Sequence, residues 1–198
     1  TNMNVLQAAD VNLELLKKDN IWAKIPSDSI LEKTAGALRA NNFDVEIVED
    51  ASAAREKVLA LIPEKAEVMT MTSETLEITG IAKEINESGK YDAVKPRLYA
   101  LDREKDGLKM QKMGAAPQWV LGSVHAITWG GKVLIASNTG SQLPAYAYGS
   151  QHVVWVVGVQ KIVKDLDSAF ERVDKYTLPL EAVRANKAYG MPGSYPSK

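Results

Sequence analysis

Apolar positions along this chain change spacing several times, from the three- and four-residue steps of helices to the alternation of strands. Residues 3–19 have the helical spacing and are predicted to form an amphipathic helix. A second helix is expected from Ser27 or Asp28 to about Asn41. The apolar run Ile21–Pro26 lies between the two. Residues 1–26 are therefore expected to be a helix and an arm that pack on the main body or on a second subunit.

Strands and helices alternate over the next part of the chain. Phe43–Val48 and Glu67–Met71 have strand patterns. Each precedes a helix: the first is capped by Asp50 or Ser52 and runs to Leu61, and the second runs from about residue 73 to residue 89. This β-α-β-α order predicts a parallel sheet with helices on its faces.

The remaining elements complete an α/β chain. In chain order we expect a short strand at 98–101, a helix at 102–113, strands at 119–124, 132–136 and 152–157, helices at 166–176 and 179–189, and a C-terminal loop. The predicted fold is a Rossmann-like, mainly parallel sheet flanked by helices, with an antiparallel portion around residues 119–137. With 198 residues and no repeat or linker, the economical expectation is a single domain, 1–198.

Composition excludes several classes of function. Lys and Arg (24) nearly balance Asp and Glu (25), so no net field favours nucleic acid. The apolar runs fall far short of the roughly 20 residues that span a bilayer, and a cytoplasmic protein is the default. Without cysteine the chain cannot itself ligate an iron–sulfur cluster, and two histidines exclude a His-rich zinc site. No P-loop or GxGxxG motif is present, so the cofactor, if any, is unknown.

Small polar residues follow the predicted strands, where open α/β sheets bind ligands. Thr72, Ser73 and Thr75 come between a strand and a helix, and their hydroxyls with the helix N–H groups would hold a phosphate or carboxylate. A helix cap alone explains the same residues. The five-residue run Asn138, Thr139, Gly140, Ser141 and Gln142 is the second such loop, and either an anion-binding nest or self-capping accounts for it.

A third group lies at the end of the strand that begins at Trp119. Gly122 permits close backbone approach, and strand alternation would put Ser123 and His125 on one face, with His125 as acid or base. The alternative is a hydrogen-bonded structural histidine. Lys161 would supply charge to an anionic ligand, or lie on the surface.

Three further features have structural or interfacial interpretations. Glu181 and Arg184 are spaced to pair with each other. His152, which opens a strand, is expected to be structural. Five aromatic residues would stack on a planar ligand or line a subunit interface, with Trp129 exposed on its Gly-flanked turn. They are Trp119, Trp129, Tyr146, Tyr148 and Trp155.

Four segments resemble successive motifs of one family, the LUD domain of lactate-utilisation proteins: VLGSVHAIT, GGKVLIASNTGSQLPAYAYG, VVWVVGVQKIV and YTLPLEAVRANKAYG. The resemblance is strongest over residues 114–190. It implies a fold like that of the ribose-phosphate isomerase, CoA-transferase and cyclo-ligase group, and a link to lactate oxidation alongside iron–sulfur partner subunits. One departure is the turn Thr128–Gly131, where relatives carry an acidic residue and Thr-Gly-Thr.

The resemblance implies a protein of lactate or organic-acid utilisation that binds a small anionic metabolite at the strand-end loops. Two alternatives stay open. The first is a non-catalytic regulatory or assembly subunit of an iron–sulfur lactate oxidoreductase, in a homo-oligomer or with that partner. The second is a CoA-transferase or cyclo-ligase type of enzyme, for which the resemblance suggests Glu74 as nucleophile. The sequence does not decide whether the protein is an enzyme.

Overall fold

A computed structural model describes residues 5–17 and 20–198, and the chain divides into two compact units. Unit 1 comprises Thr1–Glu46, Val124–Thr139 and Gly158–Lys198. Unit 2 comprises Ile47–Ser123 and Gly140–Val157. The chain passes between the units at residues 46–47, 123–124, 139–140 and 157–158, and several of the predicted loops coincide with these crossings. Each unit is described by itself.

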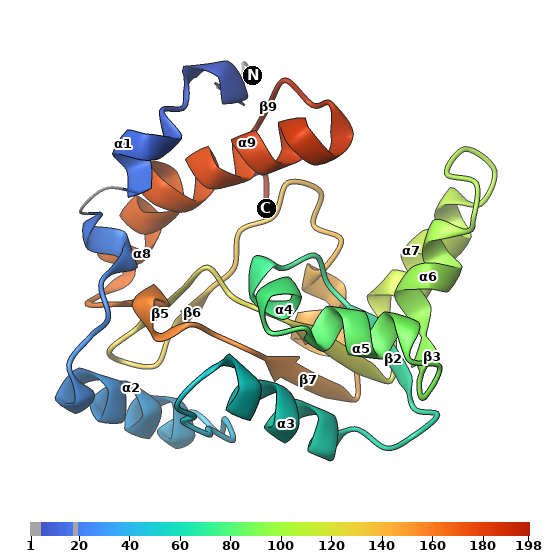
Figure 1. Cartoon of the computed structure of the whole chain (residues 1–198), viewed down its shortest axis with the longest axis horizontal. Helices are drawn as coiled ribbons and strands as arrows, with labels where there is room; N and C mark the ends of the chain where they lie inside the picture. Colours follow the sequence, from blue (N-terminus) through green and yellow to red (C-terminus); the bar gives the residue numbers. More distant parts are fainter. Residues whose placement is uncertain (1–4, 18–19) are drawn as a thin grey trace. The chain divides into compact units, whose positions relative to one another are not determined.

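Unit 2 contains the predicted parallel sheet, of which Figure 1 labels β2, β3 and β7. Its strand order is β3-β2-β4-β7, and every pair is parallel. The strands are β2 (Glu67–Thr70), β3 (Asp92–Ala93), β4 (Trp119–Gly122) and β7 (His152–Trp155). The helices are α3 (Ala51–Leu61), α4 (Glu74–Ile78), α5 (Ile81–Glu87), α6 (Val94–Tyr99), α7 (Gly107–Ala115) and the π-helix η3 (Ala145–Gly149). The α/β class is confirmed.

Alternation along β2 and β4 divides the core of unit 2 between the two faces of the sheet. Val68 and Leu121 pack with α3, α4 and α5 on one face. Met69 and Val120 pack with α6, α7 and η3 on the other. Both faces are therefore covered by helices, as a mainly parallel sheet requires.

Unit 1 is built around a three-stranded sheet of order β6-β5-β8. β5 (Ala126–Thr128) pairs with β6 (Val133–Leu134) antiparallel and with β8 (Ile162–Val163) parallel, so the predicted antiparallel portion is present. Ala126 and Val163 pack on Ala169 and on Trp22. The helical segments are η1 (Ala8–Asp10), α1 (Leu13–Lys17), η2 (Ile21–Ala23), α2 (Asp28–Ala40), η4 (Val159–Lys161), α8 (Leu166–Arg172), the π-helix η5 (Val173–Thr177) and α9 (Leu178–Tyr189).

Local capping signals predicted helix starts well. Ser27 and Asn41 flank α2. The side chain of Asp50 caps α3 by accepting a hydrogen bond from the Ala53 N–H, and Asp165 caps α8 in the same way through Ser168. These starts are confirmed because a cap depends on residues within one helical turn.

Four other predicted elements are wrong. The helix expected over 3–19 is, over the described residues 5–17, the strand β1 (Leu6–Gln7), η1 and α1, because β1 pairs with β9 (Gly193–Ser194) of the expected C-terminal loop. Phe43–Val48 is not a strand. The helix over 73–89 is two helices, broken at Gly80, whose φ is +71°. Residues 98–101 overlap the end of α6 instead of forming a strand.

No helix in the described part of the chain has both the length and the apolar character that a membrane crossing requires.

Candidate functional site

The predicted site residues fall into both units, so the structure presents two separate sets. Unit 1 holds His125, Asn138, Thr139 and Lys161. Unit 2 holds the other nine: Thr72, Ser73, Glu74, Thr75, Gly122, Ser123, Gly140, Ser141 and Gln142. The alternation that placed Ser123 and His125 on one strand face is wrong, because β4 ends at Gly122 and His125 stands on a bend where the chain has already entered unit 1.

His125 is held firmly by its neighbours in unit 1. Its backbone N–H donates to the Leu134 carbonyl at 3.0 Å, and its Nδ1 accepts from the Ala136 N–H at 3.2 Å. Because Nδ1 is an acceptor, the proton of the neutral imidazole is on Nε2. Burial, and then the charges of Lys161 and Arg172, lower the pKa of His125 to about 4, against a smaller opposing effect of Glu181. His125 is therefore neutral at physiological pH.

Arg172, near the end of α8, is the residue that sequence analysis missed. It is only 3% exposed. Its Nη1 donates to the His125 carbonyl at 2.6 Å and to Thr177 Oγ1 at 3.0 Å, and its Nε donates to the Trp22 carbonyl at 3.3 Å. Burial lowers its pKa, and Tyr176 opposes this. The available signal was its position three residues after the buried Ala169, on the apolar face of the helix.

Lys161 is the third basic group of this cluster. It ends η4 and directly precedes β8, whose Ile162 pairs with Ile127 of β5. Burial, followed by the charge of Arg172, lowers its pKa to about 8. We refer to His125, Lys161 and Arg172 as the basic cluster.

Glu181, the acidic group that raises the pKa of His125, is already paired. Glu181 forms two 2.6 Å hydrogen bonds with Arg184, three residues further along α9, and this pair strongly raises the pKa of Arg184. The sequence prediction of this pair is confirmed. The bidentate pair holds the Glu181 carboxylate on Arg184, whose own positive charge it balances. Glu181 therefore offsets only part of the positive potential at the basic cluster.

Two residues of the predicted anion-binding nest, Asn138 and Thr139, belong to unit 1, and Asn138 is hydrogen-bonded to the C-terminal segment. Asn138 Nδ2 donates to Ser194 Oγ at 3.4 Å, and Ser197 Oγ donates to the Asn138 carbonyl. The backbone of Ser137 exchanges three hydrogen bonds with Ser197 and Lys198. Residues 190–198, expected to be a loop, thus fix the position of this polar segment. Ligand contact by Asn138 and Thr139 stays a prediction.

The strand ends of unit 2 are close together, as open-sheet geometry requires. The Met71 N–H donates to the Leu121 carbonyl at 2.8 Å, and so β2 and β4 carry Thr72 and Ser123 from neighbouring carboxyl ends. Ser73 Oγ accepts from the Leu76 N–H at 3.4 Å and caps α4. The capping interpretation is confirmed for Ser73. Glu74 is exposed in the first turn of this five-residue helix.

Tyr146, not a ligand, makes the close approach to Gly122. A Cβ at position 122 would overlap the Tyr146 hydroxyl, which hydrogen-bonds to the Ser123 backbone. Burial raises the pKa of the phenol well above its usual value. Tyr146 also meets Trp155 edge-on at 5.6 Å. Gly122 therefore accommodates a tyrosine of its own unit, and contact of Gly122 or Ser123 with a ligand stays a prediction.

The other aromatic residues have varied surroundings. His152 stacks on Trp119 with ring centroids 4.1 Å apart, which agrees with its expected structural role. Trp129 is only partly exposed, and Lys33 lies over its ring at 5.4 Å. Tyr148, by contrast, is 96% exposed.

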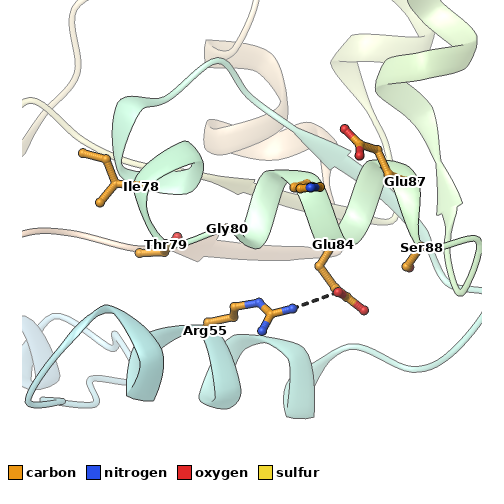
Figure 2. Close-up of a pocket in the computed structure, with 8 residues that line it drawn as sticks. Arg55, Ile78, Thr79, Gly80, Glu84, Glu87 and Ser88 are labelled. Atoms are coloured by element: carbon orange, nitrogen blue, oxygen red, sulfur yellow. Dashed lines mark hydrogen bonds and ion pairs between the residues drawn. The ribbon is translucent and has the colours of Figure 1, made fainter.

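A shallow groove of about 560 Å³ lies in unit 2 between α3 and the α4–α5 pair (Figure 2). The Arg55 side chain crosses toward Glu84, whose carboxylate it meets at 2.8 Å, and Lys90 bonds the other oxygen at 2.9 Å. This pairing lowers the pKa of Glu84. None of the predicted site residues lines the groove. Within residues 5–17 and 20–198, no group of three or more His, Cys, Asp or Glu side chains is arranged to hold a metal ion.

The histidine of the basic cluster gives a first prediction. Because its pKa is about 4 in the folded chain and 6.5 ordinarily, the unfolded chain takes up a proton between these pH values that the folded chain does not. The free energy of unfolding is therefore expected to fall as pH drops from 6.5 to 4. In His125→Asn, whose amide oxygen replaces Nδ1 as acceptor, this fall should be smaller. Urea unfolding at a series of pH values measures it.

NMR titration provides the control for this prediction. The chain has two histidines, so the signal lost in His125→Asn identifies His125. An ordinary titration near pH 6.5 for that signal would contradict the burial argument.

Comparison with known proteins agrees with the sequence motifs. The LUD domain family model matches residues 31–198. No curated protein and no solved structure matches the chain.

Proposed function

Because the chain belongs to the LUD domain family, we propose that it binds a small anionic metabolite in the utilisation of lactate or a related organic acid. The proposed site is the basic cluster of unit 1. A carboxylate is the expected anionic group, since guanidinium and ammonium groups recognise it by charge and hydrogen bonding.

The observation that carries this proposal is the buried guanidinium of Arg172, which is only 3% exposed and donates to the carbonyls of Trp22 and His125 and to Thr177 Oγ1. These three acceptors are neutral, and a buried charge is costly unless it is paired. A bound carboxylate would supply negative charge beside Arg172, and the neutral His125 would offer its Nε2–H as a hydrogen-bond donor. Asn138 and Thr139 are proposed ligand contacts from the same unit.

A thermal-shift screen tests the proposal, with lactate, glycolate, pyruvate, sugar phosphates, ATP and CoA esters as probes. A ligand at about 100 times its Kd adds roughly 2.7 kcal/mol to the free energy of unfolding. For a chain of this length that corresponds to about 5–10 °C in Tm. We expect the small carboxylates to give the shift and Lys161→Met to reduce it.

Lys164→Met is the matched control, because Lys164 is exposed and lies three residues further along. It should leave the shift unchanged. Binding of lactate should also weaken above about pH 8, where Lys161 loses its charge. If a carboxylate raises the Tm and Lys161→Met does not reduce that rise, the binding site is not the basic cluster. The site would then be assigned to the strand-end residues of unit 2, at positions 72–75, 122–123 and 140–142.

A second candidate is a non-catalytic subunit that docks on an iron–sulfur oxidoreductase. It is favoured by Tyr148, whose side chain is 96% exposed and is of a type enriched at protein interfaces. A flat response across the whole panel would support this candidate over metabolite binding. A shift with CoA esters or ATP alone would support the CoA-transferase or cyclo-ligase alternative instead.

A further inference from the structure

Helix α7 of unit 2 presents leucine and lysine side chains on an exposed face. Leu108 is 66% exposed, and Lys109 and Lys112 are exposed as well. Their spacings of three and four residues make Lys112 a neighbour of both on the helix surface. The opposite side of α7 packs on α6, which Figure 1 shows beside it: Gly114 is buried, and a Cβ there would lie 3.7 Å from Leu98 Cδ1.

This face contains a shallow groove of about 440 Å³. It is lined by three lysines, one aspartate and two apolar side chains: Lys105, Asp106, Leu108, Lys109, Lys112 and Met113. Glu104, in the loop before α7, does not line it. The groove shares no residue with the basic cluster, which belongs to unit 1, or with the groove between α3 and the α4–α5 pair.

The positive charge of the groove is little compensated by nearby carboxylates. α7 itself contains no acidic residue. The carboxylate of Asp102 accepts from two backbone N–H groups of the loop before α7, and that of Asp106 accepts from the Asp102 N–H. Lys105 approaches Asp102 only at 3.8 Å, and such an exposed pair contributes little. Among the described residues, no carboxylate pairs with Lys109 or Lys112.

We propose that this face of α7 docks an acidic segment of a partner protein, whose carboxylates lie against the lysines and whose apolar side chain covers Leu108. Charge complementarity is the argument for this occupant. The groove carries three cations against one anion, although the whole chain has a net charge of −1. An amphipathic segment with glutamates beside a leucine matches both the charge and the apolar surface of the groove.

An anionic membrane matches this face less well. Helices that lie on membranes bury a large apolar face. On α7, Met110 and Met113 are partly buried, and Leu108 is the one strongly exposed apolar side chain of the helix. The observations therefore favour a protein segment over a lipid surface. This docking surface does not depend on the anion site of unit 1.

Fluorescence anisotropy with the full chain tests the proposal. The probe is a short fluorescein-labelled peptide with glutamates on either side of two leucines, and the comparison peptide has lysine in place of every glutamate. We expect only the acidic peptide to bind, and its binding to weaken as salt is added. Lys109→Glu combined with Lys112→Glu should raise the Kd at least about tenfold. Leu108→Ala should raise it about fivefold.

Lys187→Glu is the matched control, because Lys187 is an exposed helix lysine of unit 1. It should leave the Kd unchanged, and an equal loss of affinity would overturn the proposal in favour of attraction by overall charge. NMR shift changes on binding should fall at residues 105–113, and changes elsewhere alone would also overturn it. The double glutamine variant, Lys109→Gln with Lys112→Gln, removes the charges without reversing them and should give an intermediate Kd.

Two further results separate this proposal from its alternatives. Binding to phosphatidylserine vesicles without binding to the peptide would overturn it and assign the face to a membrane surface. Absence of binding to either probe would overturn it as well. The thermal shift with lactate should be the same in the Lys109→Glu, Lys112→Glu variant as in the unchanged chain. Failure of the docking surface and failure of the anion site are therefore distinguishable.

Discussion

Replacing Arg172 with methionine is expected to lower the free energy of unfolding by about 4 kcal/mol. The guanidinium donates to the carbonyls of Trp22 and His125 and to Thr177 Oγ1. Each buried acceptor that loses its donor costs about 1–3 kcal/mol. Removal of the buried charge returns part of this. For a chain of this length the change corresponds to a Tm lower by on the order of 10 °C.

Arg39→Met is the control for this prediction. Arg39 is exposed and donates to a single carbonyl, that of Val45, at 2.9 Å. Its loss should change the free energy of unfolding by no more than about 0.5 kcal/mol. Equal effects of the two substitutions would refute the structural role of Arg172.

Arg172→Met has a second readout that distinguishes electrostatics from packing. The charge of Arg172 contributes to the lowered pKa values of both His125 and Lys161. In the variant, the NMR titration of His125 should therefore move from about 4 toward its ordinary 6.5. An unchanged titration in a folded variant would show that burial alone sets the pKa of His125.

The second large effect is expected from Gly149→Ala, at about 3 kcal/mol of destabilisation. Gly149 ends the π-helix η3, and a Cβ there would overlap the backbone carbonyl oxygen of Ala115, the last residue of α7. A backbone carbonyl cannot rotate away as a side chain would, and so η3 and α7 must separate. Chemical denaturation of the two proteins measures the difference.

Gly114→Ala is the matched control within the same unit. Gly114 lies inside α7, and its Cβ would meet only Leu98 Cδ1, at the ordinary contact distance of 3.7 Å. Alanine is favoured over glycine inside a helix by about 0.5–1 kcal/mol. The two glycine-to-alanine changes should thus have opposite signs. Destabilisation of similar size in both would contradict the packing of η3 on α7.

Local sequence determined the elements whose stability depends on their own residues. Asp50 and Ser73, each named as one of two possible caps, do cap α3 and α4, because a cap depends on residues within one turn of the chain. The succession of strand and helix patterns indicated a parallel sheet with helices on its faces. Of the two strands in that pattern, Glu67–Met71 contains β2, whereas Phe43–Val48 does not form a strand. The pair Glu181–Arg184 followed from its spacing on one helix.

Only the tertiary structure decided the remaining elements and the composition of the basic cluster. The pairing of β1 with β9 joins residues nearly the whole chain apart, and no local pattern carries that partner. Likewise, His125 and Lys161 were recognised as candidates singly, but Arg172 joins them from a helix 47 residues beyond His125. The burial of Arg172 arises from packing between segments that are distant in sequence. The same packing buries His125 and Lys161 and so lowers their pKa values. Residue types and spacing do not encode these contacts.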